Sequence, residues 1–148
     1  MKLNNKGFSF VELLAAVAIL AILTSIAIVG VSRILNKAHD EFYNNEEKNL
    51  VLAAQAYYNA NKSELPKVIG KKKEITAAKL LETNFLKKEL TAYDGKTPCE
   101  NDESYVKVFK YGQSDYSYTA YLTCGDRSAK EQEKNEQPII NAAFPGIK

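Results

Sequence analysis

Histidine, the commonest metal ligand and a frequent catalytic residue, occurs only once in the sequence, at His39. With no second histidine and no cysteine beside it, it cannot form a histidine-based metal site. The chain also lacks a glycine-rich phosphate-binding loop. Four acids fall in predicted loops, but their spacing matches no calcium-binding loop: Asp102, Glu103, Asp115 and Asp126. We therefore predict no metal ion, no cofactor and no enzymatic activity.

Cysteine is scarce as well, with Cys99 and Cys124 the only two in the chain. They form no CxxC motif, so they do not indicate a zinc site. In an oxidising compartment two cysteines this close in sequence usually form one disulfide. Such a bond stabilises a domain by roughly 3–4 kcal/mol in the chain-entropy model. The alternative is a pair of free thiols.

The net charge is low, since the chain has 20 basic and 18 acidic residues. Lys2 and Lys6 precede a long apolar segment, and without them the chain has 18 residues of each sign. The sequence pI of about 8.4 is therefore no sign of nucleic-acid binding, and nucleic acid stays a possible partner without support. Basic residues before an apolar segment keep that end in the cytoplasm, so we expect the rest of the chain to lie outside.

The one long apolar run covers residues 8–31. Of these 24 residues only Ser9, Glu12, Thr24 and Ser25 are polar, and only Glu12 is charged. A helix of this length spans roughly 36 Å at 1.5 Å per residue, which exceeds the hydrocarbon core of about 30 Å. The segment is therefore predicted to be a membrane-spanning helix.

Glu12 is unusual in such a helix. An ionised side chain inside the membrane costs on the order of 3 kcal/mol and requires a partner. Lys6 lies outside the apolar run and is not that partner. Cleavage after Gly7 would create a positively charged α-amine on Phe8, four residues before Glu12 and close to the membrane surface.

The basic leader that ends in Gly7, the segment Phe8-Ser9-Phe10-Val11-Glu12 and the apolar run behind it resemble a type IV prepilin over residues 2–35. The resemblance implies that a membrane prepilin peptidase cleaves between Gly7 and Phe8 and methylates Phe8. It also implies that Glu12 neutralises the N-terminal amine of a neighbouring subunit during filament assembly. The alternatives are an uncleaved signal anchor and a secretory signal peptide.

The predicted helix continues past the membrane as an amphipathic helix over residues 32–61, a stretch without proline or glycine. Apolar residues recur there at helical spacing, so one helix of roughly 50 residues is expected. In prepilins this outer half packs against a sheet, which the resemblance also implies here. Many family members carry a proline near position 29, where this chain has Ile28-Val29-Gly30. Gly30 weakens a helix by about 1 kcal/mol, but it removes no hydrogen bond.

After the helix, residues 62–73 are predicted to be a solvated linker. Pro66 and Gly70 break helices, and Lys71-Lys72-Lys73 is a run of like charge. Residues 75–90 have helical spacing, with Thr76 as the N-cap and Asn84 as a point of interruption. Residues 93–96 have the composition of a turn.

Residues 105–111 and 116–123 have the composition of two strands joined by a hairpin loop. Their tyrosines suit a strand, although a binding face or an electron path is an alternative for them. Residues 125–148 are predicted to form either an edge strand or a tail.

We predict an α+β fold, in which a long N-terminal α-helix packs on a small antiparallel β-sheet. The predicted parts are a leader peptide (1–7), a transmembrane and assembly helix (8–31), its amphipathic continuation (32–61) and an extracytoplasmic globular part (62–148).

The predicted function is that of a structural subunit of a type IV pilus or related filament. Its predicted partners are other pilin subunits, prepilin peptidase, the membrane and the pilus assembly machinery. It would be a single-pass membrane precursor first and part of a surface filament later. The alternatives are a minor pilin or pseudopilin of a secretion or DNA-uptake machine, and a membrane-anchored binding module that does not polymerise.

Overall fold

The computed structural model describes residues 7 and 9–143 of the chain, without the side chains of residues 26–29 and 137–143. Phe8, the leader lysines and the last residues, 144–148, lie outside the described residues. The chain divides into two compact units, Met1–Asp40 and Glu41–Lys148, which we call the N-terminal unit and the C-terminal unit. The predicted boundaries at residues 7, 31 and 61 concern processing and membrane depth, and they stay predictions.

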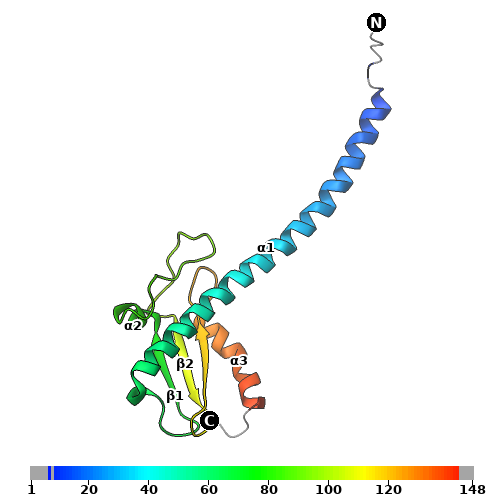
Figure 1. Cartoon of the computed structure of the whole chain (residues 1–148). Helices are drawn as coiled ribbons and strands as arrows, with labels where there is room; N and C mark the ends of the chain where they lie inside the picture. Colours follow the sequence, from blue (N-terminus) through cyan, green and yellow to red (C-terminus); the bar gives the residue numbers. More distant parts are fainter. Residues whose placement is uncertain (1–6, 8, 144–148) are drawn as a thin grey trace. The chain divides into compact units, whose positions relative to one another are not determined.

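Helix α1 runs without interruption from Phe10 to Ala60 (Figure 1). Its 51 residues contain no proline and a single glycine, so every residue has the N–H that a helical hydrogen bond requires. The prediction of one long helix is confirmed. In the C-terminal unit its apolar stripe is buried, and the stripe comprises Tyr43, Leu50, Ala53, Ala54, Tyr57 and Tyr58.

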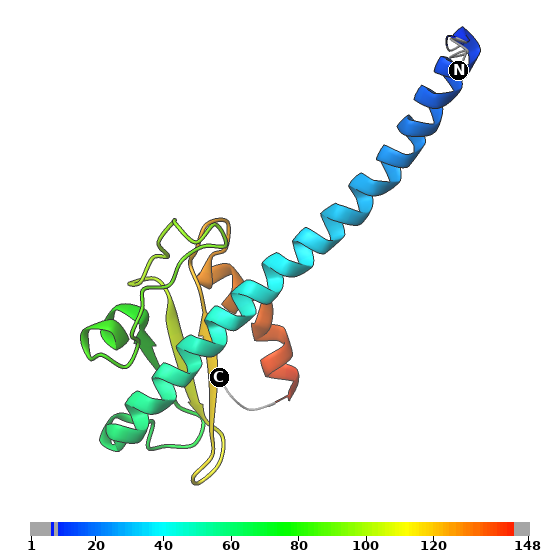
Figure 2. The same cartoon turned by 45° about the horizontal axis from the view of Figure 1, so that its top comes forward.

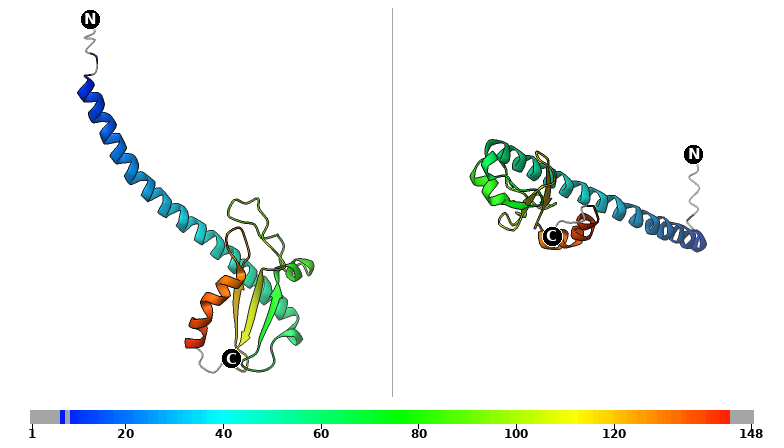
Figure 3. Two further views of the ribbon diagram at one scale, coloured as in Figure 1. Left: turned by 180° about the vertical axis from the view of Figure 1, so that it is seen from behind. Right: turned by 90° about the horizontal axis from the view of Figure 1, so that it is seen from below.

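The sheet of the C-terminal unit is antiparallel, with the order β1 (Lys72–Thr76), β2 (Tyr105–Lys110) and β3 (Tyr116–Tyr121) (Figure 3). Central strand β2 pairs Val106 with Ile75 on one side and with Ala120 on the other. These three side chains are buried in the same core as the apolar stripe of α1, which crosses the sheet (Figure 2). The predicted hairpin and the α+β layout are confirmed.

Strand β1 corrects the predicted linker over residues 62–73. A short 3-10 turn, η1 (Lys62–Glu64), follows α1, and β1 then begins at Lys72. The first three residues of β1 are charged and exposed, so the strand shows no apolar alternation that would reveal it in the sequence. Charged side chains are typical of an edge strand, which pairs through its backbone with only one neighbouring strand.

The predicted helix over residues 75–90 is much shorter in the structure, where α2 covers only Ala77–Glu82. Its predicted cap is confirmed, because the Thr76 Oγ1 accepts a hydrogen bond from the Lys79 N–H at 3.3 Å. Its predicted interruption is confirmed as well, because Asn84 has a φ of 59°, in the left-handed region that ends helices. Residues 85–90 are irregular, so the apolar spacing there reflects core contacts and not a helix.

Within the described part of residues 125–148 the chain forms a helix, α3 (Ala129–Ala143), so the predictions of an edge strand or a tail are wrong there. Pro138 lies inside this helix, where a proline lacks the N–H for a helical hydrogen bond. The first half of α3 is fixed by side-chain bonds to the sheet, described below. It lies beside β3 and is bonded to side chains on the sheet face opposite to α1 (Figure 3).

Candidate functional site

The N-terminus of α1 is capped by Ser9, which directly precedes the helix, and by Glu12 of its first turn. The Ser9 Oγ accepts a hydrogen bond from the Val11 N–H at 3.3 Å, and the Glu12 carboxylate accepts one from the Ser9 N–H at 3.0 Å. This Ser-x-x-Glu arrangement resembles a capping box, except that the Ser9 Oγ bonds to the Val11 N–H and not to the Glu12 N–H, and it satisfies donors that the helix itself leaves unpaired. The sequence alone offered no partner for Glu12, whereas the structure gives its carboxylate one in the same chain.

Behind this cap, α1 is apolar on all sides. Every residue from Ser9 to Ser25 is exposed, and Leu20, for example, is 60% exposed. The most apolar 18-residue window of the helix has a mean hydropathy of 2.7, and none of it is buried within the molecule. A helix that is apolar all round requires an apolar environment, which no described residue supplies. By length and composition this helix can cross a membrane.

The two hydroxyl groups in this segment are satisfied by the helix itself. The Thr24 Oγ1 donates to the carbonyl oxygens of Leu20 and Ala21, both at 3.0 Å. The Ser25 Oγ donates to the Ile22 carbonyl oxygen at 2.7 Å. A polar group in hydrocarbon costs several kcal/mol unless it is hydrogen-bonded, so these bonds make the segment compatible with lipid.

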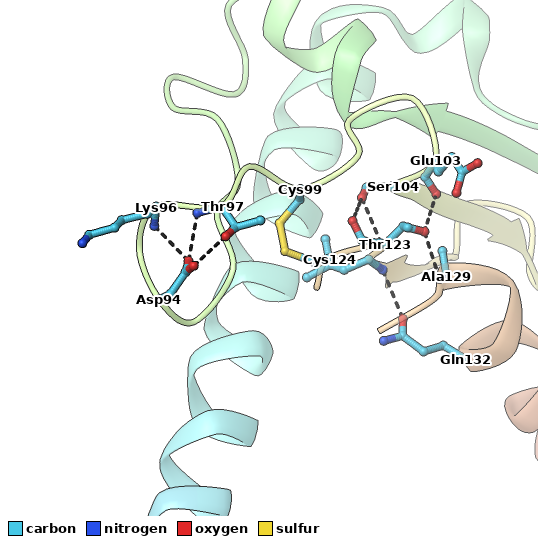
Figure 4. Close-up of a disulfide and its surroundings, with 11 residues drawn as sticks. Asp94, Lys96, Thr97, Cys99, Glu103, Ser104, Thr123, Cys124, Ala129 and Gln132 are labelled. Atoms are coloured by element: carbon cyan, nitrogen blue, oxygen red, sulfur yellow. Dashed lines mark hydrogen bonds between the residues drawn. A yellow bond between two sulfur atoms is a disulfide. The ribbon is translucent and has the colours of Figure 1, made fainter. Parts of the chain in front are cut away.

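In the C-terminal unit, a disulfide joins Cys99 and Cys124 across the two ends of the β2–β3 hairpin (Figure 4). Beside it, buried Ser104 accepts a hydrogen bond from the Thr123 N–H at 3.1 Å through its Oγ. The Glu100 N–H donates to the Thr123 carbonyl oxygen at 3.0 Å. Covalent and hydrogen bonds therefore fix the same point of the fold, where the chain enters β2 and leaves β3.

Helix α3 is attached to this point through side chains. The Thr123 Oγ1 accepts from the Ala129 N–H, and the Gln132 Oε1 accepts from the Leu122 N–H, both at 3.1 Å (Figure 4). Ala129 is fully buried. The start of α3 is thus fixed by the residues that follow β3, which explains why a segment of such polar composition is ordered as a helix.

A network of charged and tyrosine side chains, which we call the polar seam, joins α3 to the outer face of the sheet. Glu133 of α3 accepts hydrogen bonds from the Tyr105 hydroxyl and from the Lys107 Nζ. The Lys107 side chain is only 11% exposed, and its Nζ also lies 3.1 Å from a Glu74 carboxylate oxygen. Farther along α3, the Glu136 carboxylate accepts from the Tyr121 hydroxyl at 3.1 Å.

Burial and bonding act in opposite directions on the ionised groups of the polar seam. For Glu133, burial alone would raise the pKa, but the bonds from Lys107 and Tyr105 outweigh it and hold the pKa below its usual value. For Lys107, burial alone would lower the pKa, and the two carboxylates reverse this so that the pKa is raised. Both groups are therefore charged at neutral pH, and α3 is attached by a stable ion pair.

The predicted site residues fall into separate parts of the molecule. Cys99 and Cys124 lie together, Glu12 lies in the first turn of α1, and Gly7 is exposed. Phe8, the predicted methylation site, lies outside the described residues. Among the side chains that the structure describes, no group of three or more His, Cys, Asp or Glu could hold a metal ion.

Two Ser-x-x-Glu sequences mark the starts of α1 and α3. Ser9 and Glu12 have the Ser-x-x-Glu spacing of a capping box, which would have identified the helix start and a partner for the carboxylate. Ser128 and Glu131 have the same spacing directly at the start of α3. The polar seam had no such signal, because Lys107 and Glu133 are 26 residues apart.

Comparison with known proteins identifies one part of the chain. Residues 2–28 match the family model described as the prokaryotic N-terminal methylation motif, which is the signal of type IV pilin and pseudopilin precursors. No curated protein and no solved structure matches the chain significantly. The match covers the capped, exposed and apolar start of α1, and it supports membrane anchoring of the precursor.

Proposed function

We propose that this chain is a structural subunit of a type IV pilus or a related filament. The observation that carries the proposal is the match to the N-terminal methylation motif over the start of α1, where every side chain from Phe10 to Ser25 is exposed. A membrane supplies an apolar environment for the precursor, and a bundle of identical helices supplies one for the assembled subunit. No described residue suggests catalytic work for the chain, and a structural role requires none.

In this proposal, prepilin peptidase cleaves between Gly7 and Phe8 and methylates the new terminus. The Phe8 amine is then a cation one residue before the Ser9 cap. The Glu12 carboxylate already accepts from the Ser9 N–H at 3.0 Å, and a carboxylate can accept further bonds with its other lone pairs. Glu12 can therefore keep its helix capped while it binds the amine of an adjacent subunit, which would set the axial position of each helix.

Burial of the apolar side chains provides the cohesion of the filament. At about 25 cal/mol per Å² of apolar surface, a leucine that is 60% exposed in the single chain contributes on the order of 1–2 kcal/mol when covered. Many side chains of this kind line the start of α1. The sum is large enough to hold subunits together, while the Glu12 pairing supplies register.

The decisive experiment is N-terminal mass spectrometry of the mature protein, combined with recovery of sheared surface filaments. A terminus of N-methyl-Phe8 and recovery in filaments support the proposal, and an intact Met1 in cells with active prepilin peptidase contradicts it. A low copy number in filaments would indicate the minor pilin or pseudopilin alternative. A processed protein that stays entirely in the membrane fraction would indicate the non-polymerising binding module.

A further inference from the structure

Both edges of the sheet in the C-terminal unit are unpaired among the described residues. On β3, the bond from the Tyr111 N–H to the Asp115 carbonyl oxygen at 3.1 Å sets the alternation of the ladder with β2. By this alternation, the backbone groups of Tyr116, Tyr118 and Ala120 point away from β2. The groups of Lys72 and Glu74 likewise point away from β2 on β1, since Lys110 bonds to Lys71 at 3.2 Å. At Lys72 and Glu74 on β1, and at Tyr116 and Tyr118 on β3, these groups have no strand partner among the described residues, whereas Ala120 is already buried.

The β3 edge lies beside an open groove of about 550 Å³. The α1 side of the groove presents Val51, Leu52 and Gln55, and the β3 side presents Tyr118, Thr119 and Ala120. Leu52 is 62% exposed, which is unusual for a leucine on the buried half of α1. A polar hollow of about 400 Å³ borders the same groove, shares three of its lining residues and extends along α3.

The walls of this groove and hollow are acidic. They contain four acids, Glu47, Asp126, Glu131 and Glu136, against two bases, Lys48 and Arg127. Arg127 is already engaged, since its guanidinium lies 3.3 Å from Glu47 and over the Tyr43 ring. Burial raises the pKa of Glu47 despite Arg127, and the nearby Glu136 carboxylate raises it further.

The opposite edge of the sheet is basic. Lys71, Lys72 and Lys73 are consecutive and exposed at the start of β1. Contact of two β3 edges would bring acidic walls together, and contact of two β1 edges would bring lysine runs together. Both arrangements are repulsive, whereas β1 against β3 pairs opposite charges. The lysines at the β1 edge thus disfavour contact between two β1 edges and favour contact between a β1 edge and a β3 edge.

We propose that the β1 edge of one copy docks along the β3 edge of a second copy, with Lys71–Lys73 facing the acidic groove walls. The proposal rests on the proposed function as a filament subunit and names the contact between its C-terminal units. Such a contact joins two different surfaces, so each docked copy still offers a free edge of each kind. Heterologous contacts of this type propagate, which a filament requires.

The first test places a photoreactive side chain at Leu52 in the full chain, expressed in its own membranes with the processing machinery present. Illumination is expected to give a cross-linked dimer, and mass spectrometry should identify the peptide that contains Lys71–Lys73 of the second copy. A cross-link to residues 144–148 of the same chain, to another protein, or to nothing would overturn the proposal.

The second test uses charge reversal. Lys72→Glu with Lys73→Glu, and separately Glu131→Lys with Glu136→Lys, are each expected to reduce the Leu52 cross-link at least fivefold. The two pairs combined in one chain should restore it, because the four reversed residues then again face residues of opposite charge. Lys87→Glu with Lys88→Glu, a matched pair of exposed lysines outside both edges, should leave the cross-link unchanged.

Failure of rescue in a combined variant whose circular dichroism shows a folded C-terminal unit would overturn the contact. The proposed function is measured separately, by the mature terminus and by filament recovery. Normal processing and filaments without the cross-link would refute the contact alone. A cross-link in a chain that keeps Met1 would refute the processing and keep the contact.

Discussion

The same helix has two different environments in the two units. Leu20 in the N-terminal unit is 60% exposed and Leu50 in the C-terminal unit is fully buried, although both are leucines in the interior of α1. The residue type is therefore not what distinguishes the two halves. The difference is that the sheet covers Leu50, whereas no described part of this chain covers Leu20. The apolar side chains of the N-terminal half of α1 are buried only when another molecule, lipid or protein, surrounds them.

The polar groups of the two units differ in a parallel way. Thr24, Ser25 and Glu12 bond to backbone atoms within four residues of themselves. In the C-terminal unit, Ser104 bonds to Thr123, and Glu133 bonds to Lys107. Local bonds survive when a helix moves from one apolar environment to another, so α1 can leave the membrane for a bundle without losing them. The long-range bonds instead hold one specific tertiary structure.

The largest effect is expected from Glu12→Gln. Glutamine can keep the capping bond to the Ser9 N–H, because the capping box accepts Glu or Gln, so the variant removes only the charge. Loss of one partner of a buried ion pair costs roughly 3–5 kcal/mol, which is at least about a hundredfold in an equilibrium. The ratio of filament-associated to membrane-associated protein should fall accordingly, measured by fractionation of sheared cells.

Processing of the Glu12→Gln chain is the internal control, since the cut at Gly7 and folding of the C-terminal unit should both continue. If the variant enters filaments as efficiently as the wild type, hydrophobic packing alone sets the register. The pairing of Glu12 with the Phe8 amine would then have to be abandoned.

Cys99→Ser should affect only the C-terminal unit. The disulfide closes a loop between residues separated by 25 positions, and its loss is expected to lower the free energy of unfolding by roughly 3–4 kcal/mol. The chain has nine tyrosines and no tryptophan, so near-ultraviolet circular dichroism of tyrosine in detergent can follow unfolding. Membrane insertion and the mature terminus should not change.

The wild-type protein provides the companion measurement. Under denaturing conditions without reductant it should contain no thiol that reacts with a thiol reagent. Reaction of both cysteines would show that the bond does not form in the cell.

Two identical substitutions compare the halves of α1 directly. Leu50→Ala removes a fully buried side chain and should lower the free energy of unfolding of the C-terminal unit by roughly 2–5 kcal/mol. Leu20→Ala removes an exposed one and should leave that value unchanged within about 0.5 kcal/mol. Its effect should appear instead in filament recovery, where Leu20 is proposed to become buried. Equal destabilisation by both variants would mean that the two units fold as one.

Local periodicity made much of this fold predictable. The helical spacing of α1 and the β-rich composition of β2 and β3 are properties of consecutive residues, and the methylation motif lies within residues 2–28. Strand β1 was not predictable in this way, because its specificity comes from pairing with β2 while its own exposed side chains are charged. Helix α3 was hidden by Pro138 and by a polar face whose partners lie on the sheet. The polar seam arises only after β2 and α3 meet.

The smallest effect is expected at this seam, from Glu133→Gln. The pKa of Glu133 is lowered in the folded state, because the bonds from Lys107 and Tyr105 outweigh burial. An acid whose pKa is lower in the folded state stabilises the fold at pH values above its pKa in the unfolded state, near 4.5. This contribution to stability is lost as the pH falls through the pKa of the folded state. The wild type should therefore lose roughly 1–2 kcal/mol of stability from this group between pH 7 and strongly acidic conditions.

At pH 7 the free energy of unfolding of Glu133→Gln should be lower than that of the wild type by roughly 1–2 kcal/mol. This difference between the two proteins should disappear under strongly acidic conditions. The raised pKa of Glu47 acts in the opposite direction, favouring the fold at low pH, but it is common to both proteins and cancels in their difference. Glu131→Gln, an exposed acid on the same helix, is the matched control and should parallel the wild type at every pH. Urea unfolding of each protein across this pH range measures the difference. A difference in the free energy of unfolding that stays constant with pH would mean that Glu133 stabilises the fold through the shape of its side chain and not through its charge. Helix α3 would then be attached to the sheet by packing rather than by the ion pair between Glu133 and Lys107.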